Sequence, residues 1–143
     1  LMGADEAAAA LDAAADLTLP VMVSFSVEAD GGVMFGGTVW EAAVMAQELG
    51  AAAVGVNCSV GPDQLEAVIR SVRDAVQIPV IAKPNAGLPV MDALGQAHYS
   101  MGPEDFARHM RTLAKAGAGI VGGCCGTTPE YIRQMAAGGD GFA

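Results

Sequence analysis

The sequence predicts an α/β fold built around a parallel sheet, and two observations lead to this. Short apolar stretches alternate regularly with helix-like segments along the 143 residues, and such alternation is typical of parallel sheets. The predicted strands are apolar almost throughout, as expected where helices cover a parallel sheet. Two architectures fit: an open doubly wound sheet, or part of a (β/α)8 barrel. A full barrel needs about 250 residues, so four βα units would form half of one.

The elements follow from propensity and from helix-start signals. An alanine-rich stretch with early acidic residues predicts a first helix, because acidic side chains favour helix N-termini. Thr38 and Glu41 have the spacing of a capping box, and Gly50 is suited to end the helix that they begin. Predicted strands cover residues 21–27, 52–57, 78–82 and 118–123, and predicted helices cover residues 5–15, 39–49, 61–76, 102–116 and 128–135.

Two connections are longer than usual. Residues 28–37 form a glycine-rich loop with few charges, and residues 84–101 are predicted to be a long loop. Loops of that length in compact domains are usually functional or mobile. After Met135 the composition turns to glycine and alanine, and we expect irregular structure there.

Composition excludes several kinds of partner. The net charge is −9 with only seven basic residues, whereas nucleic acids and anionic membranes require clustered Lys and Arg. Mean hydropathy is high, at +0.40, but the uncharged runs are too short to span a bilayer. No targeting pattern is present. We expect one soluble domain in the cytoplasm, and, because the chain opens on Leu1, a part of something longer.

All three cysteines lie where a predicted strand runs into a loop. Cys58 follows the second strand, and the adjacent pair Cys124 and Cys125 follows the fourth. With one strand between them, parallel strand ends lie roughly 10 Å apart. Barrel curvature brings such ends closer than a flat sheet does. One three-thiol site is therefore feasible, and it favours the barrel.

Three thiolates suit zinc with one coordination position left open, as in catalytic rather than structural sites. Such an electron-rich centre is suited to a soft ligand such as a substrate thiol, so the implied chemistry is alkyl transfer to sulfur. Two other interpretations stay open. The cysteines could be ordinary core residues, or the glycine-rich turn before the last helix could bind phosphate. Phosphate explains neither Cys58 nor the pair.

Three sequence motifs resemble those of the homocysteine-binding domain in the homocysteine S-methyltransferase family. They are Val-Asn-Cys at residues 56–58, Lys-Pro-Asn-Ala-Gly at 83–87 and Gly-Gly-Cys-Cys-Gly-Thr-Thr-Pro-Glu at 122–130. Within the family, the Pro-Asn-Ala-Gly and Gly-Thr-Thr-Pro forms are most similar to the cobalamin-dependent methionine synthases. The resemblance implies a (β/α)8 barrel with zinc held by Cys58, Cys124 and Cys125, where homocysteine is methylated to methionine.

The resemblance also implies what this chain lacks. Residues 1–143 would supply strands five to eight, the C-terminal half of the barrel, and the N-terminal half would be absent. The methyl donor would be methylcobalamin, held with folate by other modules. The isolated half is expected to be inactive. Direct transfer from betaine or S-methylmethionine is the alternative donor chemistry, and a non-catalytic fragment with structural zinc or none is the alternative of another class.

Four further residues are weaker candidates. Asn57, next to the first thiol, could bind substrate or only cap its turn. Asn85 is predicted to shape its loop rather than to ligate a metal. His98 and His109 are metal-ligand candidates by residue type alone. His98 lies in the predicted long loop, and His109 lies on a solvated helix. We expect neither histidine to bind the metal.

Overall fold

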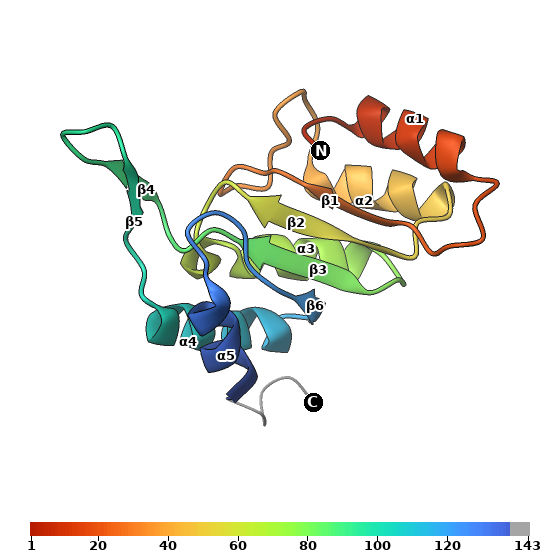
Figure 1. The fold of residues 1–143 in the computed structure, drawn as a ribbon. Helices are drawn as coiled ribbons and strands as arrows, with labels where there is room; N and C mark the ends of the chain where they lie inside the picture. The colour runs from red at the N-terminus through yellow and green to blue at the C-terminus, as the bar shows by residue number, and fades with distance from the viewer. Residues whose placement is uncertain (138–143) are drawn as a thin grey trace.

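The chain folds around a four-stranded parallel sheet in the order β1-β2-β3-β6 (Figure 1). The computed structural model describes residues 1–137. Every neighbouring pair in this sheet is parallel, which confirms the predicted α/β class. The strands are β1 (Met22–Phe25), β2 (Ala53–Cys58), β3 (Val80–Pro84) and β6 (Ala118–Val121).

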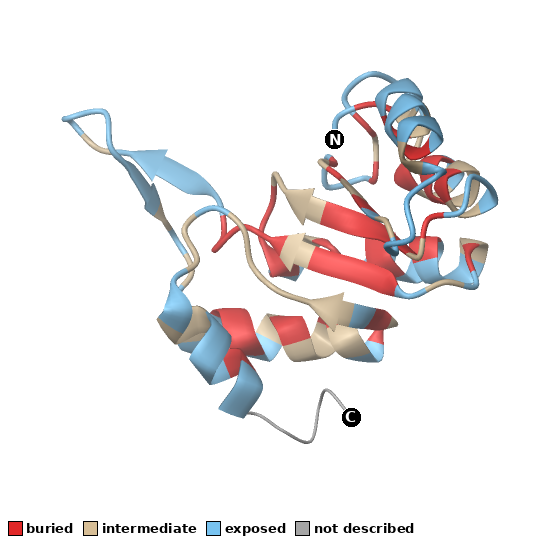
Figure 2. Ribbon diagram, turned by 45° about the vertical axis from the view of Figure 1, so that its right-hand side comes forward, coloured by how far each residue is buried: buried red, intermediate tan, exposed pale blue. Residues whose placement is uncertain are grey.

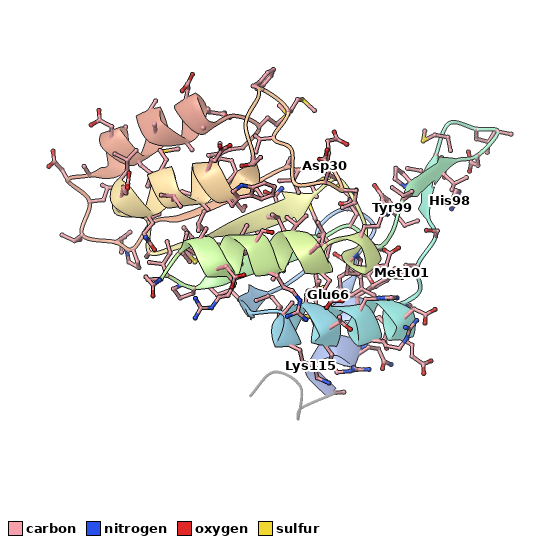
Figure 3. The ribbon with its side chains drawn as sticks, turned by 180° about the vertical axis from the view of Figure 1, so that it is seen from behind. Asp30, Glu66, His98, Tyr99, Met101 and Lys115 are labelled. Atoms are coloured by element: carbon pink, nitrogen blue, oxygen red, sulfur yellow. The ribbon has the colours of Figure 1, made fainter. Side chains whose placement is uncertain are left out.

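Helices connect these strands and pack on them. Helices α2 and α3 contact β2, α3 also contacts β3, and α4 contacts β6 and α5. Figure 1 looks onto the sheet from the face opposite α2 and α3, whereas Figure 3 shows those two helices in front. The helices are α1 (Ala4–Ala14), α2 (Val39–Glu48), α3 (Glu66–Ala75), α4 (Pro103–Lys115) and α5 (Pro129–Ala137), with a short 3₁₀ turn η1 (Pro62–Gln64) before α3.

Most predicted boundaries are confirmed within a few residues, and the capping box of α2 is present. The Thr38 hydroxyl accepts from the Glu41 backbone N–H, while the Glu41 carboxylate accepts from the Thr38 N–H. The helix predicted from residue 61 is instead divided into η1 and α3, because Pro62 opens a 3₁₀ turn. Helix α5 reaches Ala137, two residues past its predicted end. The rest of the glycine-rich tail lies outside the described residues.

The prediction of a loop over residues 84–101 is wrong in part. This segment contains an antiparallel hairpin of β4 (Pro89–Met91) and β5 (Ala97–Tyr99). Its turn is held by the Asp92 carboxylate, which accepts from the backbone N–H groups of Leu94 and Gln96. The hairpin projects from the end of the sheet and is exposed along its arm (Figure 2).

The core lies between the sheet and its helices. Val54 and Val56 of β2 are fully buried and join apolar side chains of α2, α3 and α4. A Cβ on Gly55 would lie 2.0 Å from the carbonyl oxygen of Ile81 in β3. Strands β2 and β3 therefore fit together only because residue 55 is glycine.

Residue Leu1 continues the sheet beyond β1. Its amino group donates to the Ser24 carbonyl (3.0 Å), and its carbonyl accepts from the Ser26 N–H (2.8 Å). This pair of bonds is the parallel pattern on either side of Phe25.

Among residues 1–137, no helix combines the length and apolarity needed to cross a bilayer.

Candidate metal centre

The structure brings the three cysteines together at the carboxyl ends of the parallel strands. Their sulfur atoms all lie within 4.8 Å of one another, and those of Cys58 and Cys125 are 3.6 Å apart. No disulfide joins them. Cys58 and Cys124 are half-buried, whereas Cys125 is exposed, so the cluster opens to solvent on one side. Among the described residues, this is the only group of three or more Cys, His, Asp or Glu residues close enough to share a metal ion.

Cys58 reaches the cluster through an unusual backbone turn. It ends β2 opposite Pro84, and both Cys58 and Ser59 have positive φ, at 61° and 63°. Positive φ costs energy for a residue with a Cβ and is found mainly at functional sites. The Val60 N–H donates to the Cys58 carbonyl, and the Asn85 N–H donates to the Val60 carbonyl. These bonds hold the turn against the segment after β3.

The cysteine pair is positioned because the chain after β6 keeps hydrogen bonding to the chain after β3. The Gly122 N–H donates to the Ala82 carbonyl (3.0 Å), and the Cys124 N–H donates to the Pro84 carbonyl (2.8 Å). The Ala86 N–H donates in turn to the Cys125 carbonyl (2.9 Å). Strand β3 thus holds both thiol-bearing segments, one on each side.

A tight turn after the pair lets both sulfurs face Cys58. The Thr127 hydroxyl and N–H both donate to the Cys124 carbonyl, at 2.7 and 3.1 Å. Gly126 has φ of +80°, in the left-handed region that favours glycine. Gly123 is required as well, because a Cβ there would lie 2.5 Å from the Thr127 hydroxyl.

Asn85 is a buried polar link between the two segments, and its role is larger than the sequence indicated. It is 4% exposed, and its Oδ1 accepts from the Cys125 N–H at 3.0 Å. Its own N–H donates to the Val60 carbonyl at 3.1 Å. The prediction that Asn85 shapes its loop agrees with these contacts. Its place directly after a buried strand end, beside Pro84, was the available signal that it would be buried.

The thiols differ in acidity. Burial raises the pKa of Cys58, but hydrogen bonds from the Ser59 backbone and from the thiols of Cys125 and Cys124 outweigh it, so the pKa of Cys58 lies below its ordinary value. Burial, together with the hydrogen bond and charge of Cys58, raises the pKa of Cys124 to about 11. In the metal-free cluster Cys58 therefore ionises before Cys124, whose proton helps to hold that charge.

This donor set fits zinc. Three sulfur ligands from one compact cluster match the soft ligands that zinc accepts, and three protein ligands leave a tetrahedral position free. The exposed side of Cys125 lies where a further ligand can approach. Metal binding would displace the remaining thiol protons.

The other candidate residues lie apart from the sulfurs or face away from the core. Since Val54 and Val56 point to the helices, alternation along β2 directs Asn57 to the opposite face of the sheet. His98 pairs with Asp92 on the hairpin, with Nε2 and Oδ2 2.8 Å apart. His109 lies on α4. Neither histidine belongs to the thiol cluster.

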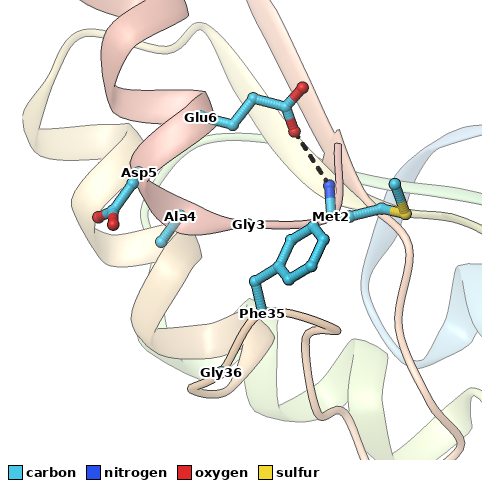
Figure 4. A pocket seen from close by; sticks show the side chains of 7 residues that line it. All are labelled: Met2, Gly3, Ala4, Asp5, Glu6, Phe35 and Gly36. Carbon is cyan, nitrogen blue, oxygen red and sulfur yellow. Dashed lines mark hydrogen bonds between the residues drawn. The ribbon is translucent and has the colours of Figure 1, made fainter.

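A cavity of about 460 Å³ lies elsewhere, at the start of α1. Figure 4 shows it beside Met2, Gly3 and Phe35, where the Met2 N–H donates to the Glu6 carboxylate at 3.3 Å. It contains no cysteine and no basic side chain. This cavity is separate from the candidate centre.

Comparison with known proteins agrees with this arrangement. The methionine synthase of Mycobacterium leprae (strain TN) is 39% identical over 120 residues, which is 83% of this chain and 10% of that protein. The methionine synthase of Mycobacterium tuberculosis (strain ATCC 25618 / H37Rv) is 38% identical over 120 residues, again 83% of this chain and 10% of that protein. The chain thus spans about a tenth of the length of these relatives.

Solved structures share the fold. The homocysteine methyltransferase MmuM from Escherichia coli, in its metallated form, matches with a TM-score of 0.76 at 21% identity, over 96% of this chain and 42% of that chain. This match confirms the predicted fold class, four βα units equivalent to about half of a (β/α)8 barrel. The family model described as "Homocysteine S-methyltransferase" matches residues 2–138. The chain therefore belongs to the homocysteine S-methyltransferase family.

Proposed function

We propose that this chain carries the thiol-activating centre of a methionine synthase, with zinc held by Cys58, Cys124 and Cys125. Homocysteine would be the substrate and methionine the product. The single observation that carries the proposal is the convergence of three sulfurs within 4.8 Å from two segments 66 residues apart (58 to 124). Family membership supports homocysteine as the substrate class.

A zinc ion at these thiolates supplies an open position that favours a second soft ligand, the substrate thiol, in its ionised and nucleophilic form. The chain's own residues prepare that position. The three thiolates would more than offset the charge of the metal, and Asn85 and the turn at Gly126 hold their geometry. The exposed side of Cys125 leaves an approach for the substrate. We propose that Asn57 contacts the bound substrate from the end of β2, next to Cys58.

Methylcobalamin is the proposed methyl donor. Identity of 39% to a methionine synthase supports this choice over direct transfer from betaine or S-methylmethionine. Cobalamin and folate would be bound by other modules, in keeping with relatives about ten times as long as the matched segment. The reduced cysteines suit a reducing cytoplasm, which we propose as the location.

We further propose that residues 1–143 form strands five to eight of the barrel. The parallel hydrogen bonds of Leu1 beside Phe25 support a preceding strand at the β1 edge. Met22 and Phe35, which are 61% and 75% exposed, would be covered by the missing half. In isolation the two open sheet edges favour association, and the half-barrel is expected to be inactive. A stable monomer in sedimentation would contradict this part.

The alternative of another class is a non-catalytic fragment whose thiols bind structural zinc or none. Metal content separates the two, measured by elemental analysis of protein purified under reductant. Wild-type protein is expected to hold one equivalent of zinc, and Cys58→Ser to lose it. His98→Ala is the control, since that side chain lies outside the cluster and the variant should keep the metal. A full equivalent in Cys58→Ser would falsify the two-segment site.

A further inference from the structure

The β4–β5 hairpin is fixed at its base to the thiol segment. The Ala86 N–H donates to the Cys125 carbonyl, and the Met101 N–H donates to the Ala86 carbonyl, at 2.9 and 3.0 Å. The Tyr131 hydroxyl of α5 donates to the Met101 carbonyl at 2.7 Å. Both ends of the hairpin are therefore held next to Cys125, although its arm is exposed.

Tyr99 is the hairpin residue that turns back onto the centre. It ends β5 and is half-buried, while its neighbour His98 is exposed and pairs with Asp92. Adjacent strand residues point to opposite faces, so the two aromatic side chains separate. Figure 3 shows Tyr99 at the end of the hairpin near the body of the molecule and His98 farther out.

The Tyr99 ring lies directly on the glycine that follows the cysteine pair. A Cβ at Gly126 would be 2.3 Å from the Tyr99 Cγ and 2.4 Å from its Cδ2. Glycine is thus required at 126 for two reasons, its positive φ and this ring. The contact places the tyrosine ring one residue from Cys125.

The ring also carries a hydrogen-bond donor. A tyrosine hydroxyl is protonated at neutral pH and can donate to a thiolate. Sulfur ligands of metals are commonly tuned by such outer donors.

We propose that Tyr99 is a positioning residue for the metal centre, its ring holding the turn at Gly126 and its hydroxyl donating to the sulfur of Cys125. This inference rests on the proposed zinc site and deepens it. A hydrogen bond to a thiolate reduces the electron density that the sulfur donates to the metal. It also fixes the orientation of the sulfur. The hairpin, which looks like a surface appendage, then contributes to the geometry of the reacting centre.

The test compares Tyr99→Phe, which removes only the hydroxyl, with Tyr99→Ala, which also removes the ring. Tyr131→Phe is the matched control, because it removes the same atom from a hydroxyl that donates to the Met101 carbonyl rather than to sulfur. The 143-residue chain would be kept under reductant, and zinc affinity would be measured by competition with a chromophoric chelator. Cobalt substituted for zinc would report the metal–sulfur bond through its charge-transfer absorption. Circular dichroism would check folding.

We expect zinc affinity to fall about tenfold in Tyr99→Phe, the lower end of the range for outer-shell partners, and further in Tyr99→Ala. The cobalt–thiolate absorption should shift in Tyr99→Phe but not in Tyr131→Phe. Unchanged affinity and absorption in folded Tyr99→Phe would overturn the inference, as would a loss confined to Tyr99→Ala. If wild-type protein binds neither metal, the proposed function fails first, and the two failures are thereby distinguished.

Discussion

The sheet end that carries the thiols and the arm of the β4–β5 hairpin are neighbours, yet they are built differently. At the sheet end, Cys58, Cys124 and Cys125 are held by backbone bonds to the chain after β3 and by the buried Asn85. The hairpin arm has few buried side chains, and Leu94 at its turn is 84% exposed. Sites placed on strand ends are held more tightly than sites on loops. The comparison indicates that the thiol cluster is preformed, whereas the arm is open to solvent.

The largest effect is expected at Gly55. A Cβ in Gly55→Ala would overlap the Ile81 backbone, so β2 and β3 must separate and the protein should lose more than about 4 kcal/mol of stability. Chemical denaturation measures this change. Gly102→Ala is the control, because nothing lies within 4 Å of its Cβ. Equal stability of the two variants would mean that the strands are not closely joined beneath the thiols.

Asn85→Ala should cost about 1–3 kcal/mol, because it leaves the part-buried Cys125 N–H without its partner, and it should also weaken zinc binding. The matched control is Gln47→Ala, whose amide oxygen accepts from the Gln77 and Ile78 N–H groups at the other end of β3. The bond to Gln77 is exposed to water and the Gln47 side chain is only half-buried, whereas Asn85 is buried. The stability loss in Gln47→Ala should therefore be smaller, and zinc affinity should be unchanged. Weaker zinc binding in both variants would contradict a specific role for Asn85.

Lowering the pH should destabilise the hairpin turn before it destabilises the sheet end that carries the thiols. The hydrogen bond from the Gln96 backbone N–H, and then the one with the His98 side chain, lower the pKa of Asp92 below its ordinary 3.8. A lowered pKa contributes stability above 3.8 and loses it as pH falls through the lower value. Amide exchange at Gln96 should accelerate below that pH while exchange at Cys124 does not. Asp92→Asn should abolish the pH dependence, and an unchanged pH profile in this variant would contradict the assignment.

The smallest effect is expected at the tip of the arm. Leu94→Ser should change stability by less than about 0.5 kcal/mol, as is usual for exposed positions, and should leave zinc affinity unchanged. Thermal unfolding with and without zinc measures both. A large destabilisation would show that the arm is packed against something, and would remove the contrast between the two regions.

The sequence was sufficient for much of the fold and for the thiols. Apolar runs and capping residues such as Thr38 identified the parallel strands and helices, and the position of each cysteine after a strand predicted their convergence. The hairpin was missed because β4 and β5 are short, exposed and without clear alternation. The contacts of Asn85 and Tyr99 depend on how distant segments meet, and no local pattern encodes that.

The central claim is that cysteines from two distant segments hold one metal ion. X-ray absorption at the zinc edge of the zinc-loaded, reduced chain tests it most directly, because it counts the sulfur neighbours of the metal. The account predicts three sulfur atoms at about 2.3 Å and a light atom in the remaining position. A zinc ion with two or fewer sulfur neighbours, or one bound mainly by nitrogen and oxygen, would contradict it.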